Sequence, residues 1–294
     1  MYDFSIIVPT YGRADSLDRL LLALTGLDYP RGRFEVIVVN DGGPVTLDAT
    51  TGAYRERLNL SLLRQANSGP GAARNHGAQQ ARGRYLAFTD DDCQPDPGWL
   101  RQMAAALEGS SGAICGGKTF NEYSGNLPAQ ATQFLMDYLY EHYNPVERLG
   151  AFYPTNNLAV PRDEFLRLGG FDGRLRFGED RDFCYRWQRQ GRPFVFAPRA
   201  VVQHGHALNF LTFVQLHFCY GGGTGQFRAM CERKGLGSAG FSSPSWYLGL
   251  VLSGIRKEPG WRGAALSSLL VVSQAASAAG LAWTALKTAL SPQP

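Results

Sequence analysis

The sequence has few cysteines, and no two of them have the C-x-x-C spacing of zinc sites and redox-active disulfides. There are five in 294 residues, and an odd, widely spaced set does not predict a disulfide framework. A reducing compartment is therefore favoured. Most of these residues are expected to be small core residues: Cys93, Cys115, Cys184, Cys219 and Cys231.

An excess of charge of one sign is also missing, because the net charge is only +4 and no long basic run occurs. Nucleic-acid-binding proteins usually carry a basic patch or tail, so no nucleic acid partner is expected. Hydrophobic residues make up 44% of the chain and charged residues 18%. This balance excludes a disordered chain and predicts a sizeable folded core.

A secretory signal peptide is not predicted, because no basic segment followed by an apolar stretch opens the chain. An apolar strand pattern begins instead at Phe4 and runs to Val8. We therefore expect a protein located in the cytoplasm, or at the cytoplasmic face of a membrane.

The first half of the chain alternates strand and helix patterns. This rhythm predicts the α/β class, with a mainly parallel nucleotide-binding sheet flanked by helices. Ligands bind beyond the carboxyl ends of such strands, where Thr10 to Arg13, Asn40-Asp41 and Asp90 to Asp92 are expected to meet. The predicted strands are 4–9, 34–39, 60–63 and 84–88, and the predicted helices are 17–24 and 71–82.

Three consecutive carboxylates, Asp90, Asp91 and Asp92, follow the fourth predicted strand. They repel one another, which is costly unless a cation lies beside them. Mg²⁺ and Mn²⁺ prefer oxygen ligands and often bridge protein carboxylates to phosphates, so this turn is a candidate metal site. The alternative is an acidic surface turn without a ligand. Pro95 and Pro97 stiffen the turn, which favours the functional interpretation.

Two further segments carry candidate groups. Glu179 and Asp180 open a predicted helix, where carboxylates either cap the helix or provide a general base. His204 follows an apolar strand and is a candidate metal ligand, with His206 as the competing choice.

A loop of small residues runs from Asn67 to Gly77 and feeds a helix, so its backbone N–H groups can approach a phosphate. Arg74 within it can neutralise a phosphate or pin an aspartate. Together these segments resemble the family 2 glycosyltransferases of GT-A fold in the order and spacing of their motifs. The resemblance covers about residues 3–207, and its motifs are Ser5 to Tyr11, Val38 to Gly42, Gly69 to Gly77, Asp90 to Asp92, and Glu179-Asp180.

The resemblance implies a nucleotide-diphosphate sugar, typically a UDP-sugar, as donor and a hydroxyl group as acceptor. It implies a divalent metal, Mn²⁺ or Mg²⁺, held by Asp92, Asp90 and His204, and a general base at Asp180 beside Glu179. In the family, the residue that corresponds to Asp41 accepts a hydrogen bond from the base. The residues assigned to the donor are Pro9, Thr10, Tyr11, Arg13, Asp41, Asn67, Gly69, Arg74, Asp90 and Asp91.

The implied reaction suits these residue types. A carboxylate can take the proton of the acceptor hydroxyl as its oxygen attacks the anomeric carbon. Charge that develops on the departing nucleoside diphosphate is stabilised by the metal and by Arg74. With Asp180 opposite the metal, attack is in line and the configuration inverts. The expected setting is polysaccharide or glycoconjugate biosynthesis, with a glycan or lipid-linked acceptor.

Two details concern the acceptor. The Q-x-x-R-W signature of processive family members does not occur, so one sugar per visit is expected. Asn156-Asn157 matches an acceptor-side segment of the family, unless the pair only forms a turn.

Other functions fit the sequence less well. A nucleotidyltransferase would have a glycine-rich, basic loop after the first strand, which Pro9 to Arg13 does not match. A Rossmann oxidoreductase would have G-x-G-x-x-G at that place. A non-catalytic sugar- or partner-binding protein on the same fold would be expected to lose Arg74, Asp92 and Asp180, and all three are present.

The catalytic domain is expected to span residues 1–206, and residues 207–294 to form a helical C-terminal region. Residues 263–286 carry no charge, and 24 residues are enough to span a bilayer. Polar and apolar residues fall on separate helical stripes, which favours peripheral membrane contact over a span. Docking on protein, including homo-oligomerisation, is the alternative. Basic residues that suit anionic headgroups lie nearby, at Arg256, Lys257 and Arg262.

Overall fold

The computed structural model describes residues 2–110, 112–143, 152–205, 207–233 and 242–290. The chain divides into two compact units. The sheet unit comprises Met1–Phe120 and Tyr143–Gly205, and the helical unit comprises Asn121–His142 and His206–Pro294. Each unit has its own hydrophobic core.

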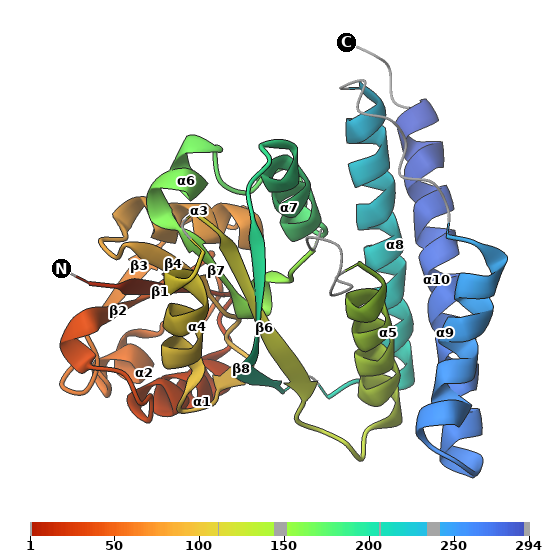
Figure 1. The fold of residues 1–294 in the computed structure, drawn as a ribbon, viewed down its shortest axis with the longest axis horizontal. Helices are drawn as coiled ribbons and strands as arrows, with labels where there is room; N and C mark the ends of the chain where they lie inside the picture. Colours follow the sequence, from red (N-terminus) through yellow and green to blue (C-terminus); the bar gives the residue numbers. More distant parts are fainter. Residues whose placement is uncertain (1, 111, 144–151, 206, 234–241, 291–294) are drawn as a thin grey trace. The chain divides into compact units, whose positions relative to one another are not determined.

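The sheet unit contains one eight-stranded sheet in the order β3-β2-β1-β4-β7-β6-β8-β5 (Figure 1). The first four strands of this order are parallel to one another. Strand β7 then pairs antiparallel with both β4 and β6, and β5 pairs antiparallel with β8. The strands are β1 (Phe4–Thr10), β2 (Phe34–Asn40), β3 (Leu60–Arg64), β4 (Tyr85–Phe88), β5 (Cys93–Pro95), β6 (Ile114–Asn121), β7 (Leu158–Pro161) and β8 (Phe194–His204).

Helices flank this sheet, as the alternating sequence pattern predicts. In the sheet unit they are α1 (Ala14–Thr25), α2 (Asp48–Gly52), α3 (Pro70–Gln80), α4 (Trp99–Glu108), α6 (Arg162–Arg167) and α7 (Glu179–Arg189). Two short 3₁₀ turns, Arg31–Arg33 and Thr155–Asn157, precede β2 and β7.

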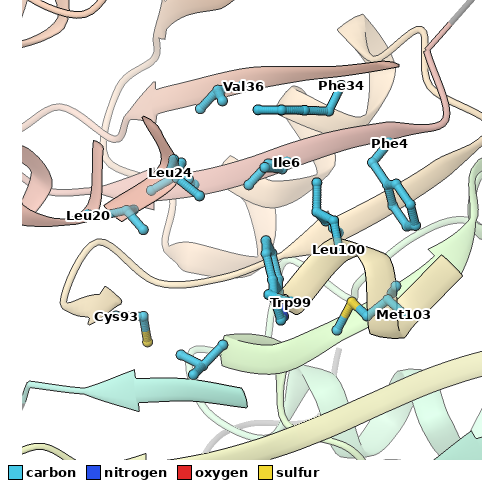
Figure 2. Packing of buried hydrophobic residues seen from close by; sticks show 14 of the residues in the cluster. Phe4, Ile6, Leu20, Leu24, Phe34, Val36, Cys93, Trp99, Leu100 and Met103 are labelled. Carbon is cyan, nitrogen blue, oxygen red and sulfur yellow. The ribbon is translucent and has the colours of Figure 1, made fainter. Parts of the chain in front are cut away.

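Strands β1 and β2 are buried along their whole length, as expected for strands covered on both faces. Side chains alternate between the faces of a strand. Ile6 and Val8 face the core that contains the leucines of α1 and residues of α4 (Figure 2). Ile7, between them, faces α3, where a Cβ atom on Gly77 would lie 2.7 Å from its Cγ2 atom. The small residues of α3 therefore let this helix pack closely on the sheet.

The helical unit consists of α5 (Leu127–Tyr143), α8 (Phe210–Arg233), α9 (Pro244–Lys257) and α10 (Trp261–Leu290). Residues 121–142, assigned above to the catalytic domain, belong to this unit. The reason is that α5 contributes apolar side chains to the core of the helical unit. That core comprises Ala131, Phe134, Leu135, Leu208, Phe213, Leu250, Leu266 and Leu270.

Helices α8 and α10 approach each other closely through glycines. A Cβ atom on Gly221 would lie 1.9 Å from the carbonyl oxygen of Ser277, and one on Gly280 would lie 1.9 Å from that of Phe218. Only glycine fits at such positions. Among the described residues, α8 and α9 therefore pack closely against one side of α10.

Candidate active site

The sheet order reverses beside β1, since the chain builds β2 and β3 on one side of β1 and returns to place β4 on the other. The crevice outside the carboxyl ends of strands at such a switch point is where ligands bind in open α/β sheets. Thr10 ends β1, Asn40 ends β2, and Asp90 to Asp92 follow β4. The topology therefore brings the predicted polar clusters to one edge of the sheet.

Arg13 binds one side of the acidic turn. Its Nε donates to Asp91 at 3.0 Å, its Nη1 donates to Asp92 at 2.9 Å, and its Nη2 also donates to Asp91. The side chain of Arg13 is 50% exposed, whereas Asp91 is buried. Arg13 is thus a counter-ion that reaches the turn from the solvent side.

Arg74 binds the other side of the turn from within the protein. Its Nη2 donates to Asp90 at 2.5 Å, and its Nη1 donates to Glu179 at 2.8 Å. Its side chain is only 4% exposed. Arg74 therefore joins the acidic turn after β4 to the start of α7, and its predicted ability to pin an aspartate is realised at Asp90.

These two guanidinium groups explain how three adjacent carboxylates are tolerated. The expectation from sequence was that a cation must lie beside them, and Arg13 and Arg74 supply positive charge from the protein itself. Compensation is incomplete at Asp91, where burial raises the pKa to about 6 although Arg13 lies beside it. An additional cation would therefore still be favourable at this turn.

Asp92 and His204 lie together, with the His204 Nε2 atom 3.3 Å from Asp92 Oδ1. Burial alone would lower the pKa of His204, but the hydrogen bond and charge of Asp92 outweigh it and raise that pKa. The two residues meet because β5 and β8 pair antiparallel with Cys93 opposite His204. His206, the competing candidate, lies outside the described residues.

Among the described residues, Cys93 also lies near this pair, although sequence analysis interpreted it only as a core residue. Its sulfur and ligand atoms of Asp92 and His204 lie within 4.8 Å of one another. The thiol is fully buried and packs in the sheet-unit core (Figure 2), and burial raises its pKa well above the ordinary value. Its position directly after the acidic turn was the available signal. The structure nevertheless agrees with its interpretation as a core residue.

Asp41 holds the loop that leads into α3. Its Oδ1 accepts hydrogen bonds from the Gln65 side chain and the Ser68 backbone N–H, each at 2.8 Å, and its Oδ2 accepts one from the Gly69 N–H at 2.8 Å. Gly69 has a φ of +89°, which favours glycine, and it immediately precedes α3. Asp41 thus fixes the start of the predicted phosphate-binding helix.

The remaining donor-side residues differ in accessibility. Tyr11 is 53% exposed, and Asn67 is also exposed. Thr10 and Pro9 are buried, with Pro9 paired to Val39 inside the sheet. Of this set, Tyr11 and Asn67 therefore offer the accessible side chains, whereas Pro9 and Thr10 shape the strand beneath them.

Glu179 and Asp180 begin α7 after Gly178, whose φ is +83°. Burial and the neighbouring Glu179 charge raise the pKa of Asp180 to about 7. Burial also raises the pKa of Glu179, despite the opposing charge of Arg74. Two residues further on, Asp182 pairs with Arg186, so its role is structural. Asp180 can therefore exchange a proton near neutral pH, whereas Asp182 only supports the helix.

The acceptor-side candidates Asn156 and Asn157 differ in burial and in their hydrogen bonds. Asn157 is fully buried; its Oδ1 accepts from the Trp99 indole at 2.9 Å, and its Nδ2 donates to the carbonyl groups of Lys118 and Ala200. It therefore ties strands β6 and β8 to α4. Asn156 is partly exposed and accepts a hydrogen bond from Thr119 at 3.3 Å.

A parallel half-sheet with an acidic turn at its switch point, continued by antiparallel strands, agrees with the GT-A fold that the sequence motifs resemble. The chain belongs to glycosyl transferase family 2, whose family model matches residues 5–183. The predicted family and fold class are thereby confirmed.

Curated relatives carry glycosyltransferase names. The pre-mycofactocin glycosyltransferase of Mycobacterium tuberculosis is 29% identical over 227 residues, which are 75% of this chain and 46% of that protein. The glycosyltransferase AglE of Haloferax volcanii is 27% identical, covering 68% of this chain and 66% of that protein. The chain thus spans about half the length of the mycobacterial relative.

Solved structures share the fold. The mannosyltransferase PcManGT of Pyrobaculum calidifontis, in complex with GDP-Man and Mn²⁺, aligns with a TM-score of 0.60 at 19% identity, covering 99% of this chain and 76% of that one. Residues 1–349 of TarS from S. aureus, in complex with UDP, align with a TM-score of 0.54 at 18% identity, covering 100% and 93%.

Proposed function

We propose that this family 2 glycosyltransferase moves a sugar from a UDP-sugar to a hydroxyl acceptor with inversion, and that Asp180 is the general base. The observation that carries the proposal is the placement of Asp180, whose pKa is raised to about 7, next to Glu179. Through Arg74, Glu179 is joined to the acidic turn. The base and the donor-side carboxylates therefore belong to one network.

A base with this pKa suits the reaction. An aspartate of ordinary pKa is a weak proton acceptor, whereas one that titrates near neutral pH is both largely ionised and basic enough at pH 7 to 8. Asp180 takes the proton of the acceptor hydroxyl as the oxygen attacks the anomeric carbon. Glu179 raises the proton affinity of Asp180 by its charge.

Asp92 and His204 would hold a divalent metal, and Asp90, in the same turn as Asp92, would be a further ligand. Carboxylates and phosphate oxygens suit both Mn²⁺ and Mg²⁺, an imidazole ligand fits Mn²⁺ better than Mg²⁺, and the incomplete neutralisation at Asp91 favours a further cation. When bound, the ion would stabilise negative charge on the departing diphosphate. The PcManGT complex contains Mn²⁺, which supports this assignment by analogy of fold.

Arg13 and Arg74 have different roles in the proposal. Arg74 is buried between Asp90 and Glu179 and stays in place to hold the two halves of the site. Arg13 is half exposed, so it could turn from Asp91 and Asp92 toward the diphosphate, while a bound metal would supply positive charge to the same carboxylates. The exchange keeps the charge of the turn compensated in both states.

Asp41 is proposed to read the base. A carboxylate can accept about four hydrogen bonds, and the loop from Gln65 to Gly69 supplies three of them. One acceptor position is then left for an N–H group, such as that of uracil. The exposed side chains of Tyr11 and Asn67 would flank the nucleotide.

The acceptor is proposed to be a glycan or a lipid-linked molecule at the cytoplasmic face of the membrane, glycosylated once per visit in polysaccharide or glycoconjugate biosynthesis. Relatives support this class by their names, which include a poly(ribitol-phosphate) beta-N-acetylglucosaminyltransferase at 36% identity over 110 residues. Asn156, partly exposed, is the acceptor-side candidate.

A donor screen tests the proposal. The purified chain is incubated with UDP-, GDP- and dTDP-sugars, each with Mn²⁺, with Mg²⁺ and with a chelator, and release of nucleoside diphosphate is measured. We expect slow hydrolysis of a UDP-sugar that requires the metal. Preference for another base would overturn the role given to Asp41, and equal rates with a chelator would overturn the metal site.

A further inference from the structure

Helix α10 presents one face that is exposed and uncharged over most of the helix. Between residues 264 and 286 its exposed positions recur every three or four residues, and all but one are apolar. We call this surface the α10 face. It comprises Ala264, Ser268, Val271, Ala275, Ala278, Ala279, Ala282, Trp283, Ala285 and Leu286.

The opposite side of α10 is already covered. Leu266 and Leu270 lie in the core of the helical unit, and the backbone of α8 packs against Ser277 and Gly280. Gly254 of α9 similarly packs against Ser267. Because these close approaches fix how α10 is rotated, the α10 face cannot turn inward without disrupting them.

A helix of the sheet unit shows what a water-facing surface looks like in this protein. The exposed positions of α1 are Asp15, Asp18, Arg19 and Leu22, so three of the four are charged. A stable amphipathic helix normally places charged residues on its solvent side. The α10 face has none, and a contiguous exposed apolar surface marks an interaction site.

A tryptophan with a basic side chain beside its ring lies near each end of this face. At the beginning, the Arg262 guanidinium lies 5.9 Å from the centre of the Trp261 ring, and Trp261 is 72% exposed. Near the end, the Lys287 ammonium lies 5.1 Å from the centre of the Trp283 ring. Tryptophan prefers the headgroup level of a bilayer, and basic side chains extend from there to water.

The charge of this region suits an anionic surface. Residues 244–290 contain four basic side chains, Arg256, Lys257, Arg262 and Lys287, and one acidic side chain, Glu258. Arg262 pairs with Glu258 at 3.0 Å and Lys257 lies 3.6 Å from Glu141 of α5, and the segment keeps a net charge of +3. Each basic group near an anionic membrane adds to the attraction. We propose that the α10 face docks on a lipid bilayer that contains anionic lipids, with the helix lying along the surface.

A flat position fits better than a span, although residues 261–287 are long and apolar enough to cross a bilayer. Helix α9 has 14 residues, about 21 Å, whereas the hydrocarbon layer is about 30 Å thick. It ends in Arg256 and Lys257 beside the start of α10. Helix α8, packed along α10, exposes Gln215 and Gln226. These groups belong at a water interface.

Membrane docking deepens the proposed function, because a lipid-linked acceptor would be met at the membrane surface. It rests on the proposed function in this respect alone. Its test uses no substrate. The full chain is mixed with vesicles of phosphatidylcholine alone or with added phosphatidylglycerol, and the bound fraction is measured by flotation. We expect binding to the anionic vesicles, weaker binding to the neutral ones, and release by alkaline carbonate.

A matched pair of variants locates the contact. Val271 and Leu286 are 52% and 51% exposed on the α10 face, and Leu22 is 55% exposed on the charged face of α1. Val271→Glu with Leu286→Glu should lower the bound fraction at least about tenfold, because a carboxylate is unfavourable among acyl chains. Leu22→Glu should bind as the unaltered chain does, and circular dichroism should show that both variants are folded.

Three results would overturn the proposal. The unaltered chain could fail to float with anionic vesicles, or the glutamate pair on α10 could bind as well as Leu22→Glu. Protein that stays with the membrane after carbonate would mean a span and not surface docking. Light scattering adds a further check, since a dimer that dissociates in the α10 variant and ignores lipid would assign the face to a second copy of the chain. Failure of the donor screen would leave all these readouts unchanged.

Discussion

The two sides of the acidic turn differ in how their positive partner is held. On the inner side, Arg74 is almost fully buried and bonds to Asp90 and Glu179. On the outer side, Arg13 is half exposed and bonds to Asp91 and Asp92. Both arginines neutralise carboxylates, but the guanidinium of Arg13 already reaches solvent, so it can exchange its partners more easily than the buried guanidinium of Arg74.

The difference indicates a division of labour. A buried, hydrogen-bonded charge network is costly to disturb and therefore suits a fixed framework. A partly exposed ion pair contributes little to stability and is easily replaced. We infer that the inner side keeps Asp180 and the acidic turn in register, whereas the outer side is where the donor and metal enter.

The largest expected effect concerns the base on the inner side. Asp180→Asn keeps the size of the side chain but removes its ability to take a proton, so transfer should fall by about 10²–10⁴-fold. Donor binding should persist, because the acidic turn, Arg13 and Arg74 are untouched. Sugar transfer is measured with radiolabelled donor, and donor affinity by calorimetry.

Asp163→Asn is the control for this variant, since the Asp163 side chain is 82% exposed and lies away from the network. It should transfer sugar at the normal rate. Normal transfer by Asp180→Asn would show that another group is the base.

The next effect is on folding. Arg74→Met leaves the buried Glu179 and the partly exposed Asp90 without their counter-ion, and removing one partner of a buried ion pair costs about 3–5 kcal/mol. The free energy of unfolding is measured by urea titration. Arg64→Met gives the contrast, because Arg64 and Asp48 are both more than half exposed and the loss of their ion pair should leave the free energy of unfolding almost unchanged. Equal losses in the two variants would contradict the structural role given to Arg74.

The framework of the sheet could be predicted because its signals are local. The buried runs of β1 and β2 and the leucines of α1 show their periodicity within a few residues. Parallel strands also require their carboxyl ends to share one edge, and Asp41 and the acidic turn both follow strands that end at this edge.

The features of the site and fold that could not be predicted depend on contacts between segments far apart in the sequence. Arg13 lies 78 residues from Asp91, and Arg74 lies 105 residues from Glu179, so no local pattern indicates either bond. The loop bonds of Asp41 depend on where the chain turns after β3. Likewise, helix α5 lies between strands in the sequence, and only the apolar surface that it buries assigns it to the helical unit.

A smaller effect links stability to pH on the inner side. The pKa of Asp180 is raised from 3.8 to about 7 in the folded protein. Between these values the folded state holds a proton that the unfolded state releases, so this group makes the protein less stable as pH rises from about 4 to about 7. Asp180→Asn removes this loss. Its melting temperature should exceed that of the unaltered chain at pH 8, and the gap should narrow at pH 5.

The same pKa predicts the activity profile. Transfer by the unaltered chain should rise as pH increases through about 7, because Asp180 acts in its ionised form. Stability and activity should therefore move in opposite directions over this range. If Asp180→Asn were no more stable at pH 8 than the unaltered chain, the pKa of Asp180 would not be raised in the folded protein.

The smallest effect is expected on the outer side, at Arg13. Arg13→Gln leaves the buried Asp91 without its counter-ion, but Asp91, whose pKa is already raised to about 6, can take up a proton, so the free energy of unfolding should fall by less than in Arg74→Met. Without the competing guanidinium, Mn²⁺ should bind the donor-free protein about two- to fivefold more tightly, as followed by electron paramagnetic resonance. Donor affinity should fall in the same variant, because the diphosphate loses a contact. Arg13→Lys keeps the charge and should lie between the two. Weaker Mn²⁺ binding by Arg13→Gln would mean that Arg13 supports the metal site as a fixed part, as Arg74 does, and the two sides would then be alike.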